Sequence, residues 1–146
     1  MELDPIVHEY VLRCGPERAF EVYTGDIASW WHPSYTANAQ TLTAVTIEPR
    51  VGGRVFESHR DGEEYGWGWV TVWEPGRRLA YTSTLAQPSG HPSEITVKFG
   101  PHDGGCRMRF EHGGWNADNA AERSKFTEWP NILDRFAALA DGAPAS

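Results

Sequence analysis

Cysteine is scarce in this sequence, which carries only Cys14 and Cys106 among its 146 residues. Two cysteines are too few for a disulfide framework, and their spacing does not match a zinc site, so we expect reduced thiols. The six histidines form no helical i, i+4 pair and no His-x-His pair, which are spacings that metal sites favour. We therefore expect neither a metal nor another cofactor.

Basic residues are also few, because 13 Lys and Arg stand against 20 Asp and Glu, a formal net charge of -7. No Lys/Arg cluster offsets the resulting repulsion of polyphosphate, so nucleic acid is not an expected partner. The sequence also lacks an apolar run of membrane-spanning length, and its first residues lack the basic segment of an export signal. These absences predict a cytoplasmic chain with no membrane partner.

Two motifs of nucleotide and hydrolase chemistry are missing. Gly52-Gly53 begins a predicted strand and Gly113-Gly114 ends one, so neither opens a helix as a nucleotide-binding loop does. No GxSxG nucleophile elbow occurs. Nucleotide-driven and serine-hydrolase chemistry are therefore disfavoured.

The residues that are present predict one folded domain over 1–146. Apolar residues make up 40% of the chain, seven residues are Trp, and a chain of this length usually builds one core. Residues 6–13 alternate in polarity as a strand does. A short helix then begins at Pro16, and a second brief turn extends from Asp26 to Pro33.

From about Val45 to Glu111 the pattern is one of strands joined by turn residues, with no helical periodicity between them. Asp-Gly, Pro-Gly and Gly-Gly pairs supply the turns of an antiparallel meander. The clearest predicted strands are 53–60, 65–74, 78–86, 94–100 and 106–112, with a further turn at 87–90.

A long helix is predicted over 118–141. Asn119 and Glu122 resemble a capping box at its start, and Asp141-Gly142 ends it. Pro130 predicts a kink, because proline removes one backbone hydrogen bond from a helix. Apolar residues at steps of three and four form a stripe that we expect to pack on the sheet, namely Phe126, Trp129, Leu133, Phe136 and Ala140.

This order of elements resembles the START-like (SRPBCC) or helix-grip superfamily, which includes Bet v 1-like proteins and polyketide cyclases. Four strings resemble the bacterial proteins related to the C-terminal domain of the Hsp90 ATPase activator. They are EPRVGGRVFE at 48–57, GWVTVWEPGRRLAYT at 68–82, EITVKFGPHDGGCRMRFEHGGW at 94–115 and WPNILDRF at 129–136. The sequence departs from that family at Cys106, where threonine is more common.

The resemblance implies an α+β helix-grip fold, in which a curved antiparallel sheet of about seven strands surrounds a long C-terminal helix, with two short helices after the first strand. It also implies a cavity, because family members are described as binders of lipids, sterols, polyketides and other apolar molecules, with a minority of enzymes. A shared fold does not by itself define a function.

The strand 65–74 places Tyr65, Trp67, Trp69 and two further large side chains on one face, and glycines and valines on the other. Three interpretations remain open for the large face. It lines a ligand cavity, it fills a core, or it points outward as a surface for another protein or a second copy.

Glu57 and His59 share one face of a predicted strand. The favoured interpretation is an ordinary ion pair on an exposed sheet face, and the alternative is an acid–base pair for proton transfer. His8 and His112 are cavity candidates by the same alternation, and Cys106 is predicted to be buried and structural.

The leading hypothesis is a protein that binds a small apolar or aromatic molecule, with the segment 26–35 at the mouth of its cavity. The alternatives are a cyclase or hydratase that uses cavity acid–base residues, and a chaperone-associated interaction module. The predicted ligand-binding residues are Tyr10, Trp30, His32, Glu57, His59, Trp67, Trp69, Tyr81, Met108, Phe110, His112, Phe126, Trp129 and Leu133. No catalytic residue is assigned.

Overall fold

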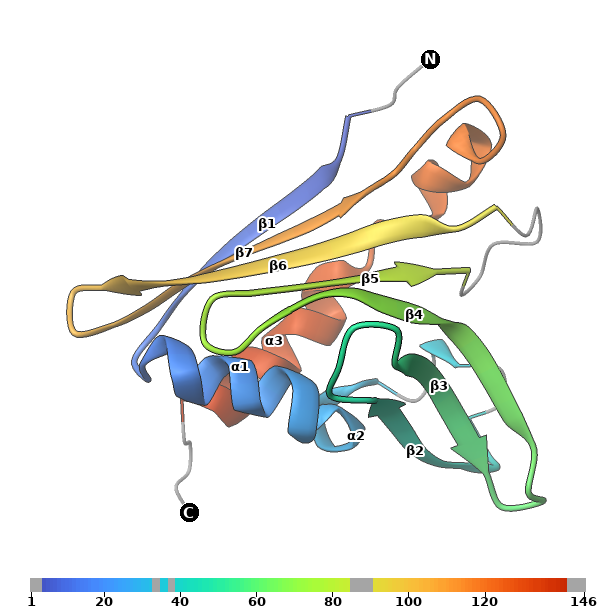
Figure 1. Ribbon diagram of the computed structural model, residues 1–146, viewed down its shortest axis with the longest axis horizontal. Coiled ribbons are helices and arrows are strands. Elements are labelled where there is room, and N and C mark those ends of the chain that lie inside the picture. The colour runs from blue at the N-terminus through green and yellow to red at the C-terminus, as the bar shows by residue number, and fades with distance from the viewer. Residues whose placement is uncertain (1–3, 33–34, 37–38, 85–90, 142–146) are drawn as a thin grey trace.

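A curled antiparallel sheet forms most of the molecule in this computed structural model, which describes residues 4–32, 35–36, 39–84 and 91–141. Its strand order is β1-β7-β6-β5-β4-β3-β2, so the sheet follows chain order except that β1 joins the far edge beside β7 (Figure 1). The strands are β1 (Ile6–Leu12), β2 (Leu42–Ile47), β3 (Arg54–His59), β4 (Glu64–Glu74), β5 (Arg78–Ser83), β6 (Ser93–His102) and β7 (Gly105–Gly113).

Among the described residues, three α-helices and a 3-10 helix accompany the sheet. They are α1 (Pro16–Gly25), α2 (Ile27–Trp30), the 3-10 helix η2 (Ala120–Lys125) and α3 (Trp129–Ala140). The helix α1 begins at Pro16, as predicted, because a first-turn proline needs no backbone N–H. The curled seven-stranded sheet with a C-terminal helix confirms the predicted helix-grip fold. Within the part of the chain that the structure describes, no helix is long and apolar enough to cross a membrane.

The C-terminal region differs from the single helix predicted over 118–141. The 3-10 helix η2 ends at Lys125, and α3 begins only at Trp129. Pro130 lies in the first turn of α3, where its missing N–H removes no helical bond, so it starts this helix instead of kinking it. Asn119 lies at the N-cap position of η2, but its side chain makes no capping hydrogen bond, since its Oδ1 accepts instead from the Asn116 backbone N–H at 2.8 Å.

The strand β4 does not keep the strict alternation predicted for 65–74. Its register shifts against β3 between Val55 and Phe56, and against β5 between Val70 and Val72. Trp67 is buried, with 3% of its surface exposed, whereas Trp69 is 55% exposed. Such bulges insert an extra residue and increase the local twist, which bends β4 and carries β2 and β3 toward the helices (Figure 1).

Close backbone packing explains one glycine in this bent strand. A Cβ added at Gly68 would lie 2.1 Å from the Thr82 carbonyl oxygen on β5. No side chain fits at that distance, so β4 and β5 can approach only because residue 68 is glycine.

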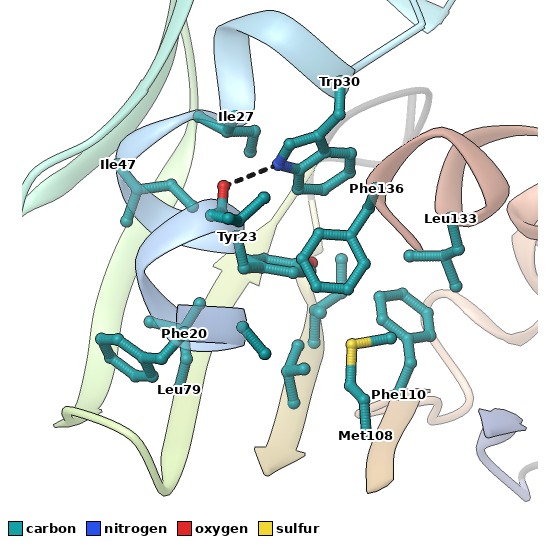
Figure 2. Close-up of a cluster of buried hydrophobic side chains, with 14 of the residues drawn as sticks. Phe20, Tyr23, Ile27, Trp30, Ile47, Leu79, Met108, Phe110, Leu133 and Phe136 are labelled. Carbon is teal, nitrogen blue, oxygen red and sulfur yellow. Dashed lines mark hydrogen bonds between the residues drawn. The ribbon is translucent and has the colours of Figure 1, made fainter. Parts of the chain in front are cut away.

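The core lies between the inner face of the sheet and the helices (Figure 2). The Tyr23 ring of α1 meets the Phe136 ring of α3 with centroids 5.4 Å apart, and Trp30 of α2 meets the same phenylalanine at 5.3 Å. The Trp30 indole N–H donates to the Val22 carbonyl at 3.0 Å (Figure 2). Burying each large apolar side chain contributes about 1.5–3 kcal/mol, so this contact region is a main source of stability.

Candidate functional site

Glu57 and His59 lie on the inward face of β3, so the prediction that they share one face of this strand is confirmed. The expected exposure is wrong, because Glu57 is 0% and His59 5% exposed. The bend of β4 explains the difference, since it places Trp67 over this part of β3. The pair is therefore an interior carboxylate–imidazole pair and not a surface ion pair.

Each carboxylate oxygen of Glu57 is hydrogen-bonded to a ring nitrogen of another side chain. Its Oε2 lies 2.6 Å from His59 Nε2, and its Oε1 accepts a hydrogen bond from Trp67 Nε1 at 2.8 Å. Hydrogen bonds to two separate partners fix the plane of the carboxylate and the direction of the imidazole. The His59 ring is thereby oriented by Glu57.

The second nitrogen of His59 contacts a hydroxyl that no sequence pattern singled out. Thr41 Oγ1 lies 2.7 Å from His59 Nδ1. Thr41 is 18 residues away in sequence and directly precedes β2, whose Leu42 pairs with His59. Only the register of β2 against β3 brings this hydroxyl to the imidazole.

Tryptophan rings connect this site to the start of α3. The Trp31 ring lies 4.7 Å from the Trp67 ring and 5.8 Å from the Trp129 ring, measured between centroids. Tyr65 adds an aromatic edge, since its ring lies 5.2 Å from that of His59 at an interplanar angle of 86°. We refer to Trp31, Trp67 and Trp129 as the tryptophan row. Trp31 was predicted only as part of the mouth and was not named among the ligand-binding residues.

A second buried histidine, His112 of β7, contacts Trp129 of the tryptophan row. Trp129 Nε1 donates to His112 Nδ1 at 3.1 Å, and His112 Nε2 lies 2.6 Å from Ser93 Oγ. An indole nitrogen can only donate, so Nδ1 accepts and the single imidazole proton lies on Nε2. Burial, with a smaller effect from the positive charge of Arg123, lowers the His112 pKa to about 3. His112 is therefore neutral.

The remaining predicted site residues fall into three groups. Five are packed in the core and contribute to its interior: Trp30, Tyr81, Met108, Phe110 and Leu133. Phe126 packs beside His112, with centroids 4.5 Å apart, although it precedes α3 and is not part of it. The third group, Tyr10, His32 and Trp69, contacts neither the Glu57–His59 pair nor His112 in the interactions described above.

Tyr10 is only partly buried at the edge strand, where its hydroxyl donates to Asp134 Oδ1 at 2.9 Å. Burial and the neighbouring carboxylate of Asp134 raise its pKa. His32 meets the Tyr35 ring at 5.3 Å. Trp69 points away from the interior, because the bulge beside it reverses the expected alternation.

Cys106 is buried, and burial raises the pKa of its thiol, which does not favour nucleophilic chemistry. Among the described residues, no group of three or more His, Cys, Asp or Glu is placed to hold a metal ion. The predicted turn at 87–90, Pro33 of the predicted mouth and the helix end at Gly142 lie outside the described residues.

Two open hollows occur on the outer face of the sheet, with volumes of about 380 and 410 Å³. Both are lined by Lys98 and Phe99, and one also by Arg107 and the other by Arg77. Neither includes Glu57, His59 or the tryptophan row. They are therefore separate from the interior site.

Comparisons with solved structures agree on the fold. Protein MLL2253 from Mesorhizobium loti has a TM-score of 0.69 and 24% identity, over 94% of this chain and 96% of that chain. The Aha1 dimer from Colwellia psychrerythraea has a TM-score of 0.68 and 17% identity over the same shares. Protein CV1439 from Chromobacterium violaceum has a TM-score of 0.67 and 21% identity, over 94% of this chain and 98% of that one.

A search of curated proteins gives no match. The family described as Activator of Hsp90 ATPase homolog 1-like protein matches residues 13–141, a region that includes β2 to β7, the tryptophan row and both buried histidines. On that match over most of its length, the chain belongs to the Activator of Hsp90 ATPase homolog 1-like family.

Proposed function

We propose that this protein binds a small apolar or aromatic molecule beside the tryptophan row, where Glu57 and His59 supply the polar contact. The observation that carries this proposal is the burial of the Glu57 carboxylate, which is 0% exposed. Flat aromatic walls with a few convergent polar groups are typical of small-molecule sites. Trp67, which donates a hydrogen bond to Glu57, and Trp31, whose ring lies 4.7 Å from that of Trp67, provide such walls.

Stability alone does not account for this carboxylate. Taking a carboxylate out of water costs several kcal/mol, and apolar residues of similar volume often replace buried ion pairs without loss of stability. Active sites are instead places where burial and charge partners are often arranged around a titratable group. The pair therefore supports a binding role more strongly than a purely structural one.

The chemistry of the site indicates what kind of molecule it takes. Indole faces favour stacking on a ring, and Tyr65, which is 46% exposed, extends the aromatic surface from His59 toward solvent. A ligand that replaces one hydrogen bond of the Glu57–His59 pair needs a polar group of its own. We infer a ring-bearing molecule with a single polar substituent.

Native mass spectrometry of freshly purified protein, followed by a calorimetric screen of one- and two-ring compounds, tests this proposal. We expect Trp67→Phe to weaken binding about tenfold or more, because it removes the indole N–H that holds Glu57. Trp69→Phe is the matched control, since it changes an exposed tryptophan of the same strand. Equal affinities of the two variants, or no bound compound at all, would count against the site.

A second candidate function is self-association or protein binding, and exposed Trp69 favours it. A tryptophan 55% exposed on a sheet face is the type of residue that anchors protein interfaces. One structural neighbour is described as a dimer. Light scattering of the wild type and of Trp69→Ser separates the possibilities: a dimer that Trp69→Ser dissociates supports this function, and a monomer at all concentrations removes self-association.

A further inference from the structure

We propose that Thr41, His59 and Glu57 form a hydroxyl–imidazole–carboxylate triad that transfers acyl groups from small aromatic or apolar esters. This inference rests on the proposed function, because the ester has to enter the site beside the tryptophan row. It adds an activity and names Thr41 as the residue that becomes acylated.

The three side chains meet the geometric requirement for an activated nucleophile. A hydroxyl must lie within about 2.6–3.2 Å of a base that a third group orients. Thr41 Oγ1 lies 2.7 Å from His59 Nδ1, and His59 Nε2 lies 2.6 Å from Glu57 Oε2. Trp67 Nε1 holds the other carboxylate oxygen at 2.8 Å, so Glu57 is held in this orientation.

The proton positions are those that base catalysis needs. The Glu57 carboxylate accepts from His59 Nε2–H, which leaves Nδ1 as the acceptor for the Thr41 hydroxyl proton. When His59 takes that proton, the buried carboxylate stabilises the resulting imidazolium. Thr41 itself is only partly buried, so its hydroxyl lies on the solvent side of the buried pair.

A second hydroxyl–histidine pair, Ser93 with His112, lacks this property. Ser93 Oγ lies as close to His112 as Thr41 lies to His59. The Trp129 N–H, however, occupies Nδ1 and keeps the proton on Nε2, the nitrogen that faces Ser93. His112 cannot remove the Ser93 proton through that nitrogen, so of these two pairs the Thr41 pair is the one arranged for catalysis.

The reaction needs no oxidant and no cofactor. Thr41 Oγ bonds to the ester carbonyl carbon while its proton passes to His59 Nδ1. The bond to the alcohol oxygen breaks, and that oxygen takes the proton from His59, leaving an acyl ester on Thr41. Water then attacks this ester with the same base, which releases the acid and restores Thr41. Thr41 and His59 are the catalytic residues, and Glu57 positions the imidazole.

The test uses the full chain with p-nitrophenyl butyrate as ester and the matching anilide as a non-hydrolysed probe of binding. We expect release of p-nitrophenol and a butyryl group on Thr41 by peptide mass spectrometry. Thr41→Ala abolishes the adduct, and Thr41→Ser retains it because the hydroxyl remains. Thr43→Ala is the matched control, since the Thr43 hydroxyl donates to the Ser58 carbonyl and meets no histidine.

Glu57→Gln tests the positioning role. We expect kcat to fall about 100-fold or more, because a glutamine amide does not stabilise the imidazolium, and KM to rise by no more than about tenfold, because Glu57 also contributes to the polar contact with the ligand. Equal ester hydrolysis by Thr41→Ala and the wild type, or an adduct only on another residue, overturns the triad. Binding of the anilide without acylation of Thr41 overturns the triad but leaves the binding proposal in place. Binding of neither compound, with no acylation, overturns both.

Discussion

The two buried histidines, His59 and His112, lie in opposite environments, although each contacts a hydroxyl and lies near a tryptophan. His59 faces a carboxylate at 2.6 Å, whereas His112 lies among the rings of Trp115, Phe126 and Trp129 and accepts an indole hydrogen bond. The first environment places a negative charge beside the ring, and the second favours the neutral ring. The comparison teaches that the third partner of an imidazole–hydroxyl pair decides whether the pair can move a proton.

The largest effect expected at neutral pH comes from removing the carboxylate that distinguishes the His59 site. Glu57→Ala leaves His59 Nε2 and Trp67 Nε1 buried without their partner. Breaking a buried pair in this way typically costs 3–5 kcal/mol, so we expect a loss of about 3 kcal/mol in the free energy of unfolding by urea denaturation. Exposed Glu63→Ala is the control and should change it by less than about 0.5 kcal/mol.

A loss below about 1 kcal/mol for Glu57→Ala would break the comparison. It would mean that the pair contributes little to holding β3 and β4 together, and that His59 does not depend on its carboxylate.

The next effect is a pH dependence that belongs to His112. Its pKa of about 3 in the folded protein lies below the ordinary 6.5 of the unfolded chain. Above pH 6.5 neither state binds this proton, and the contribution of His112 to stability is complete. As the pH falls from about 6.5 toward 3, only the unfolded chain becomes protonated, so the free energy of unfolding decreases by up to about 1.4 kcal/mol per pH unit.

Urea denaturation across that range, compared between the wild type and His112→Phe, measures this contribution. We expect a shallower decline for the variant, because it carries no imidazole to protonate. Parallel curves for the two proteins would show that His112 takes up its proton equally in both states.

The smallest expected effect sharpens the role of the indole at His112. Trp129→Phe removes the N–H that occupies Nδ1 while it keeps an aromatic ring at the start of α3. We expect a loss of about 1–2 kcal/mol in the free energy of unfolding, because a buried acceptor loses its partner. The His112 pKa should rise, because Nδ1 can then take up a proton without an indole N–H pointing at it.

Titration of the His112 ring by NMR follows that pKa, with Trp31→Phe as a control that leaves the hydrogen bond to His112 intact. An unchanged pKa in Trp129→Phe would show that burial acts without the hydrogen bond. The contrast with His59 would then rest on the surrounding rings and the distance from a carboxylate, and not on the indole hydrogen bond.

Part of this structure was predictable from local patterns. Alternation predicted β1, β3 and the shared face of Glu57 and His59, and Pro16 predicted the start of α1. The same reasoning placed Trp69 with Trp67 and extended one helix from 118 to 141, and both predictions are wrong. A bulge and a first-turn proline produced these errors, because each depends on neighbouring strands or backbone that a local pattern does not contain.

What the sequence by itself determined is the fold class and the family, because turn residues, periodicity and motif strings are properties of neighbouring residues along the chain. What only the tertiary structure decided is the chemistry of the two histidines. Thr41 reaches His59 through the pairing of β2 with β3, and Trp129 reaches His112 through the packing of α3 on β7. Protonation follows from such contacts between distant residues, since burial and hydrogen-bond partners set the energy of each charge.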